Sequence, residues 1–153
     1  MAKKKWIDVI KLDKGEIDEF LKNNRHGTLS FAGDQPYALP MGYTYAKGTV
    51  LMGVITTGRK MKCLRNSNKV CYTVCKPRWE TPKMKDRCTS LVIEGTLEEV
   101  KNRADYGFKS PPLEGMQLYR IKVTKMGARR CNRRPCEFDA QIRAAAEKEK
   151  SEA

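Results

Sequence analysis

Apolar residues alternate with polar or small residues in several short stretches of the chain, and this spacing predicts a mainly β fold. A period of two places successive side chains on opposite faces of a strand. Turn-forming residues such as glycine and proline separate the stretches. The predicted strands cover residues 27–33, 36–45, 49–56, 69–76, 88–100 and 117–126.

Three segments have helical spacing instead. Residues 13–24 begin with Asp13 and have Glu16 three positions later, which is the spacing of a capping box. Residues 58–66 and 140–150 are the other two predicted helices. We expect the first three strands to form a meander, and all six strands to form a closed or partly closed barrel, because closure removes exposed sheet edges.

Composition limits what such a barrel can be. The 153 residues include 31 Lys+Arg and 18 Asp+Glu, a formal charge of +13, which favours anionic ligands such as phosphorylated cofactors or nucleic acid. A chain of this length is expected to fold around one core. No apolar run approaches the roughly 20 residues of a membrane-spanning helix, and no signal peptide is predicted. We therefore expect a cytoplasmic protein whose six cysteines are reduced.

The stretch 36–45 has two very unequal predicted faces. Tyrosine, leucine and methionine occupy one face, whereas Ala38, Pro40, Gly42 and Thr44 occupy the other. Glycine inside a strand often marks the close approach of a ligand. A flat ring could lie along the small face, and a barrel edge with a bulge is the alternative.

A basic turn follows the third predicted strand. Thr56, Thr57, Gly58, Arg59 and Lys60 bring two hydroxyls and two cations to the start of a helix. Free N–H groups at a helix N-terminus bind anions, so the turn is a candidate phosphate site. An ordinary helix start has a similar composition, and local chemistry does not decide between the two.

Four short motifs together resemble a known family. They are PYALPMGY at 36–43, GRK at 58–60, VCY at 70–72 and SLVIEG at 90–95. Their order and spacing resemble the pyridoxamine-phosphate-oxidase-like FMN-binding split barrels, and more narrowly the nitroimidazole-resistance branch of that superfamily. The similarity runs from about Glu16 to Gly127.

The resemblance implies a mainly β protein with a six-stranded antiparallel split β-barrel and a few short helices, which forms a homodimer with FMN at the subunit interface. It implies a flavin-binding domain over residues 1–128, followed by a basic, partly helical extension over 129–153. The implied function is an FMN-dependent oxidoreductase for a small-molecule substrate, with NAD(P)H open as the electron donor, because the flavin supplies the redox chemistry. No metal ligand is expected and no catalytic residue is assigned. The implied cofactor-binding residues are Pro40, Met41, Gly42, Tyr43, Thr56, Thr57, Arg59, Lys60 and Ser90.

One position departs from the nitroimidazole-resistance branch. Gly53 stands where that branch often has a histidine, so its reductase activity does not carry over directly. The only histidine, His26, precedes the first predicted strand, and we expect it to be a solvent-facing residue rather than a catalytic one. Pyridoxamine-phosphate oxidation is not expected either, since that enzyme's substrate-binding residues cannot be placed on this chain.

Other interpretations stay open. Four arginines between residues 129 and 134 surround Cys131 and precede Cys136, where a redox pair is possible and free thiols are favoured. The same arginines and residues 3–5 could bind nucleic-acid phosphates, although a solvated basic tail is the favoured interpretation. A barrel that binds a cofactor without turnover is a further alternative.

Overall fold

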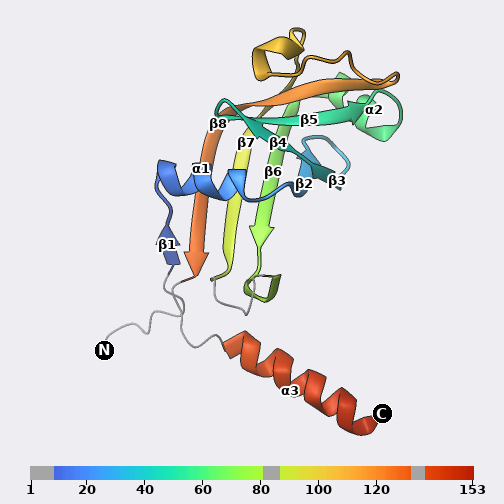
Figure 1. Ribbon diagram of the computed structural model, residues 1–153. Coiled ribbons are helices and arrows are strands. Elements are labelled where there is room, and N and C mark those ends of the chain that lie inside the picture. Colours follow the sequence, from blue (N-terminus) through green and yellow to red (C-terminus); the bar gives the residue numbers. More distant parts are fainter. Residues whose placement is uncertain (1–8, 81–86, 132–136) are drawn as a thin grey trace.

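The computed structural model describes residues 9–80, 87–131 and 137–153, which form one antiparallel sheet and three α-helices (Figure 1). The helices are α1 (Lys14–Lys22), α2 (Arg59–Asn66) and α3 (Glu137–Glu152), and short 3₁₀ helices cover Arg78–Glu80 and Arg103–Tyr106. The strands are β1 (Val9–Lys11), β2 (His26–Phe31), β3 (Tyr37–Gly42), β4 (Thr44–Ala46), β5 (Thr49–Ile55), β6 (Lys69–Lys76), β7 (Thr89–Glu99) and β8 (Met116–Cys131).

The order of the strands requires the sheet to curl. Along the sheet the order is β3-β2-β6-β7-β8-β5-β4, and β1 pairs with β8. The two outermost strands, β3 and β4, are consecutive in the chain and are joined by Tyr43 alone. The two ends of the sheet therefore lie close to each other, which gives the curled, barrel-like sheet that the sequence predicted.

Two details of the predicted sheet were wrong. The sheet has eight strands rather than six, because β1 was not predicted and the stretch 36–45 is divided at Tyr43. The first three predicted strands also do not form a meander: β3 pairs with β2, whereas β4 pairs with β5. The backbone N–H of Tyr43 donates to the carbonyl of Arg25 at 2.8 Å, outside both ladders. This contact fixes the point where the chain passes from one end of the sheet to the other.

The main core lies between α1 and one face of the sheet, which we call the inner face. Ile17 and Leu21 of α1 pack in one cluster with buried residues of β2, β6 and β7, including Leu29, Tyr72 and Ile93. Figure 1 shows α1 crossing the sheet. A helix with a narrow apolar stripe must bury that stripe against another element, and the sheet provides the partner.

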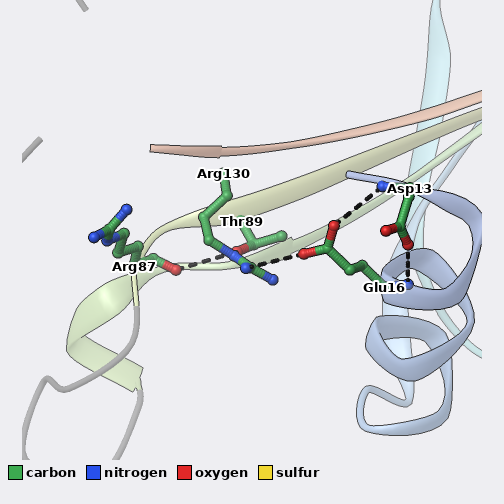
Figure 2. A network of polar contacts seen from close by, with 5 residues as sticks. All are labelled: Asp13, Glu16, Arg87, Thr89 and Arg130. Carbon is green, nitrogen blue, oxygen red and sulfur yellow. Dashed lines mark hydrogen bonds and ion pairs between the residues drawn. The ribbon is translucent and has the colours of Figure 1, made fainter. Parts of the chain in front are cut away.

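A polar network fixes the start of α1 (Figure 2). The Asp13 side chain accepts a hydrogen bond from the Glu16 N–H at 2.8 Å, and the Asp13 N–H donates to the Glu16 side chain at 3.2 Å, which is the predicted capping box. Glu16 also pairs with Arg130 of β8 at 3.3 Å. Arg130 in turn donates to the Thr89 hydroxyl of β7 at 3.4 Å. The helix is thereby linked to the two longest strands.

A smaller core lies on the opposite, outer face of the sheet. Leu51 of β5 and Leu118 of β8 are buried there with Val100, and Tyr106 and Phe108 pack against them. The segment that follows β7 therefore covers part of the outer face beside β5.

Some predictions concern residues toward the ends of the chain that lie outside the described part of the structure. Residues 3–5, Arg133, Arg134 and Cys136 belong to this group. The sheet continues to Cys131, α3 begins at Glu137, and the division of the chain at residue 128 stays a prediction. No helix in the described part of the chain combines the length and apolarity that crossing a membrane needs.

Candidate cofactor site

The N-terminus of α2 lies directly after β5 and has the features of an anion site. Gly58 is the N-cap residue with φ of 90°, a conformation that glycine adopts without steric cost. No side chain caps this helix. Because the first N–H groups of a helix have no intrahelical acceptor, they are directed toward whatever lies before Gly58.

Two cations and two hydroxyls surround this helix start, as the sequence predicted. Arg59 is exposed, and its guanidinium lies 4.3 Å from the centroid of the Tyr37 ring of β3. Lys60 is half-buried and Thr57 is exposed. The Thr56 hydroxyl donates to the Gly115 carbonyl at 3.1 Å. The cation–π contact places the Arg59 side chain against Tyr37 on the bulky face of β3, whereas Pro40 and Gly42 lie on the other face of that strand.

The small face of β3 is open to solvent. Pro40, Gly42 and Thr44 are exposed, whereas Met41 is half-buried and Tyr43 is buried. The predicted alternation of the two faces is therefore confirmed. The exposed side belongs to the outer face of the sheet, and a planar ligand could lie there against backbone rather than against bulky side chains.

The side chains of Met41 and Tyr43 face away from this surface. Tyr43 is 7% exposed, and its hydroxyl donates to the Leu21 carbonyl at 2.8 Å. Burial raises the pKa of Tyr43 to about 12, with a smaller contribution from Tyr45, so the phenol is neutral at physiological pH. The Tyr72 hydroxyl donates to the Met41 carbonyl at 2.6 Å. Both residues therefore hold β3 against the core, and only their backbone could face a ligand on the outer side.

A cavity of about 370 Å³ adjoins Gly42 on the outer face. Its charged lining residues, among those described, are Arg25 and Arg103. Gly53 also lines it, and a Cβ atom at that position would lie 2.9 Å from the Met116 Cε atom. The place beside Gly53 is thus occupied by a methionine side chain, and no imidazole is present there. The remaining lining residues are Tyr43, Thr44, Leu51, Met52, Phe108, Pro112, Leu113, Met116, Gln117 and Leu118.

Ser90 is not brought to this site within one subunit. Ser90 of β7 pairs with Cys75, six residues along β6 from Lys69, and a strand rise of about 3.3 Å per residue makes this about 20 Å. Figure 1 shows α2 at the end of the sheet opposite the start of β7. The other predicted site residues lie in β3 and the residue after it, in the turn after β5 and at the start of α2, whereas Ser90 lies at the far end of β7.

Comparison with protein families assigns the chain to one family. The sequence profile described as pyridoxamine 5'-phosphate oxidase matches residues 13–130. The chain belongs to this family. The family predicted from the four motifs is therefore confirmed. The match covers α1 and nearly all of the curled sheet. A comparison with curated protein sequences gives no significant match.

Solved structures show the same fold. An FAD-binding protein from Mesorhizobium loti is 21% identical, with a TM-score of 0.63 over 80% of this chain and 97% of the other. The FAD binding protein from Mycobacterium smegmatis is 18% identical, with a TM-score of 0.65 over 80% and 98%. A protein described as a candidate 5-nitroimidazole antibiotic resistance protein from Bacteroides thetaiotaomicron is 16% identical, with a TM-score of 0.65 over 82% and 89%.

The structure also brings residues to the site that the sequence did not single out. His26 begins β2 rather than preceding it, and it pairs directly with Gly42. It is exposed, as predicted, but it stands beside the open face of β3. Arg25 and Arg103 lie about 80 residues apart in the chain and line one cavity. Only strand pairing and loop placement reveal such neighbours, because no local pattern in the sequence connects them.

Proposed function

We propose that this member of the pyridoxamine 5'-phosphate oxidase family binds FMN as a homodimer and acts as an oxidoreductase on a small molecule. The observation that carries the proposal is the uncapped N-terminus of α2, whose Arg59 contacts Tyr37 of β3, the strand that presents Pro40 and Gly42 on its open face. A phosphate site at a helix start that contacts β3, together with a flat face on that strand, would suit the two ends of a flavin mononucleotide.

The residues at the helix start suit a phosphate dianion. Helix N–H groups and the positive end of the helix dipole attract anions. Arg59 can offer a planar fork of donors, and Lys60 offers a point charge. The Thr57 hydroxyl is exposed at the same turn. The high positive charge of the chain, +13, adds a general attraction for the anionic cofactor.

The outer face of β3 suits the flavin ring. Pro40 and Gly42 present little side-chain bulk, so the ring could approach the backbone closely. Flavin, when bound, supplies hydride or electron transfer, and the protein supplies position and electrostatics. His26 stands beside Gly42 as a donor or acceptor at the ring edge. The segment with Phe108 and Leu113 would limit the access of water to this region.

The adjoining cavity is the place proposed for the substrate. Its two arginines, Arg25 and Arg103, favour an anionic molecule, and its walls include Phe108, Leu113 and Met116. NAD(P)H is itself an anion and is the electron donor to test first. Because Gly53 supplies no imidazole and Met116 fills the adjoining space, we do not propose nitroimidazole reduction as the activity.

A homodimer would explain the position of Ser90. Within one subunit Ser90 is remote from α2, but a two-fold axis could bring the partner's Ser90 to the phosphate site. Val92, two residues along β7, is 42% exposed, and it lines a cavity of about 390 Å³ with Ser90 and Arg129. An exposed apolar side chain beside a predicted cofactor residue supports a subunit contact on this face.

The absorption spectrum of the purified protein tests the proposal directly. We expect flavin bands at one flavin per subunit, and chromatography after heat release should identify FMN rather than FAD. Two of the similar structures are named as FAD-binding, so this step decides between the cofactors. No flavin after incubation with either cofactor would overturn the proposal.

Replacing the two cations at the helix start tests the site itself. Arg59→Ala together with Lys60→Ala should weaken FMN binding at least 100-fold, since about 3 kcal/mol of charge-assisted contacts is lost. The matched control is Lys62→Ala with Arg65→Ala, which removes the same charge from exposed positions farther along α2. Fluorescence titration measures both affinities. Equal affinities for the two double variants would remove the assignment of the phosphate site.

A further inference from the structure

Three cysteines meet at the end of the sheet that is remote from α2. Cys75, Cys88 and Cys131 line one cavity of about 320 Å³ at the ends of β6, β7 and β8. All three are free thiols; Cys75 is exposed, and the other two are half-buried. Ser90, which is proposed to complete the partner's flavin site, lines the same cavity, but none of the three cysteines is assigned to that site.

Cys88 and Cys131 lie directly opposite each other. The Cys131 N–H donates to the Cys88 carbonyl at 2.9 Å, which extends the ladder in which Thr89 pairs with Arg130. Residues of a hydrogen-bonded antiparallel pair have Cα atoms about 5.5 Å apart. Disulfides most often join Cα atoms about 5.5–6 Å apart. The backbone is therefore already at the spacing of a disulfide.

The two thiols also share the outer face of the sheet. Figure 2 shows Arg130 directed toward Glu16 of α1, on the inner face, with Thr89 beside it. Side chains alternate along a strand, so the neighbours Cys88 and Cys131 point to the opposite side. No rearrangement of the strands is needed to bring both sulfurs to the same face.

Cys75 is a poorer partner for Cys88. It pairs with Ser90, so Cys88 is its diagonal neighbour, at about 7–8 Å by Cα atoms. Desolvation raises the pKa of the Cys75 thiol, and Cys88 and Glu80 raise it further, which lowers its fraction of reactive thiolate. Among the described residues, no group of three or more His, Cys, Asp or Glu is placed to hold a metal ion. A thiol reaction therefore fits the cluster better than metal binding.

We propose that Cys88 and Cys131 form a reversible disulfide in the folded protein. With hydrogen peroxide as oxidant, each thiol first loses its proton, and these two protons later combine with the two hydroxide leaving groups. One thiolate attacks a peroxide oxygen, the O–O bond breaks, and a sulfenic acid and one water form. The second thiolate attacks the sulfenic sulfur, which forms the S–S bond and releases the second water. Two thiols and one peroxide thus give one disulfide and two waters.

The position of the pair makes the bond reducible as well as accessible. Cys88 precedes the first residue of β7, and Cys131 is the last residue of β8. The Cys88 Sγ atom accepts a hydrogen bond from the Arg78 N–H at 3.2 Å, and this contact must be given up when Cys88 turns to Cys131. Exposed or strained disulfides have higher reduction potentials and are the labile ones.

Peptide mapping of the full chain tests the proposal. Trypsin separates Cys63, Cys88, Cys131 and Cys136 onto different peptides, and Cys71 shares one with Cys75. After stoichiometric peroxide and alkylation, the main cross-link should join the peptides of Cys88 and Cys131, with a loss of two hydrogens. Dithiothreitol should restore both thiols.

Two controls identify the cause of the cross-link. Protein oxidised in urea should lose the preference for this pair, because the fold no longer holds the thiols together. Cys63→Ser should keep the link, and Cys131→Ser should abolish it. A main cross-link between Cys131 and Cys136 or between Cys75 and Cys88, or none in the folded protein, would overturn the proposal.

Discussion

At the scale of single residues, buried tyrosine hydroxyls hold the two sides of the core together. Tyr43 reaches the Leu21 carbonyl of α1, and Tyr72 reaches the Met41 carbonyl of β3. Their rings meet edge to face, with centroids 5.8 Å apart. Each hydroxyl donates to a main-chain carbonyl of another element, so these contacts contribute to stability and position the strand that carries Gly42.

Tyr43→Phe should lower the free energy of unfolding by about 1 kcal/mol at pH 7, because one buried hydrogen bond is lost. The pKa of Tyr43 is raised to about 12, mainly by burial. The unfolded phenol ionises near pH 10, and the folded phenol does not. The contribution of the Tyr43 phenol to the free energy of unfolding is therefore complete below about pH 10. It is lost as the pH rises toward 12, and the free energy of unfolding falls by up to about 1.4 kcal/mol per pH unit.

Urea unfolding between pH 7 and pH 11 measures this effect. Tyr43→Phe should show a shallower alkaline loss than the wild type, and part of the loss should remain because the pKa of Tyr72 is raised as well. Tyr106→Phe, a change on the outer face, is the matched control. An unchanged alkaline slope in Tyr43→Phe would show that its ionisation does not contribute.

Sequence patterns predicted the direction of these side chains but not their contacts. The alternation along 36–45 correctly placed Tyr43 and Gly42 on opposite faces, and the structure shows that Tyr43 is buried and Gly42 exposed. It could not show that Tyr43 bonds to a helix 22 residues earlier, or that His26 pairs with Gly42. Those contacts depend on which strands become neighbours, and no local spacing encodes that choice.

At the scale of elements, a bulge shapes the longest pair of strands. Glu94 pairs with Lys125, whereas the next residue, Gly95, pairs with Val123, so Thr124 is the extra residue. A Cβ atom at Gly95 would lie 2.2 Å from the Lys122 carbonyl oxygen. Only glycine permits this approach of the two backbones. The bulge bends β8 and increases its local twist, which helps the sheet to curl.

Gly95→Ala should lower the free energy of unfolding by about 1–3 kcal/mol, because the clash is with backbone and can be relieved only by moving a strand. Gly127→Ala is the matched control: it lies in β8, and a Cβ atom there would have no neighbour within 4 Å. Chemical denaturation compares the two variants. Equal stability would show that the bulge adapts to a side chain at Gly95.

The elements differ in how well the sequence predicted them. The helix at Asp13 and the strand β6 were predicted well, because a capping box and a regular alternation are local signals. The break at Tyr43 was missed, since the alternation continues through it while the hydrogen bonds change partner. Strand β1 has three residues, all exposed, so no apolar pattern could reveal it.

At the scale of the whole molecule, the curled sheet separates two regions of chemistry. The start of α2 and the open face of β3 lie at one end, and Ser90 and the cysteine pair lie at the other. The four motifs of the sequence predicted one site from residues at both ends. Motif spacing carries no information on whether residues of a site come from one subunit or two, and that question decides the role of Ser90.

A mixing experiment shows whether Ser90 contributes to the flavin site of its own subunit or to that of the partner. Arg59→Ala/Lys60→Ala subunits lack the phosphate site, and we expect Ser90→Trp to block flavin binding with a bulky, exposed side chain. Each variant alone should bind little FMN. If the partner's Ser90 completes the site, a mixed dimer has one intact site, formed by the helix of one variant and the serine of the other. Random exchange makes half of the dimers mixed, so about a quarter of all sites should recover FMN.

The same mixture distinguishes a site within one subunit. In that case every subunit of a mixed dimer carries one of the defects, and no flavin should be recovered after exchange. Unfolding and refolding the two proteins together, followed by gel filtration and flavin absorbance, gives the recovered fraction. Wild-type protein refolded in the same way sets the full value. Normal FMN binding by Ser90→Trp alone would place Ser90 outside the site altogether, and the cofactor would then be held by the α2 end of the sheet.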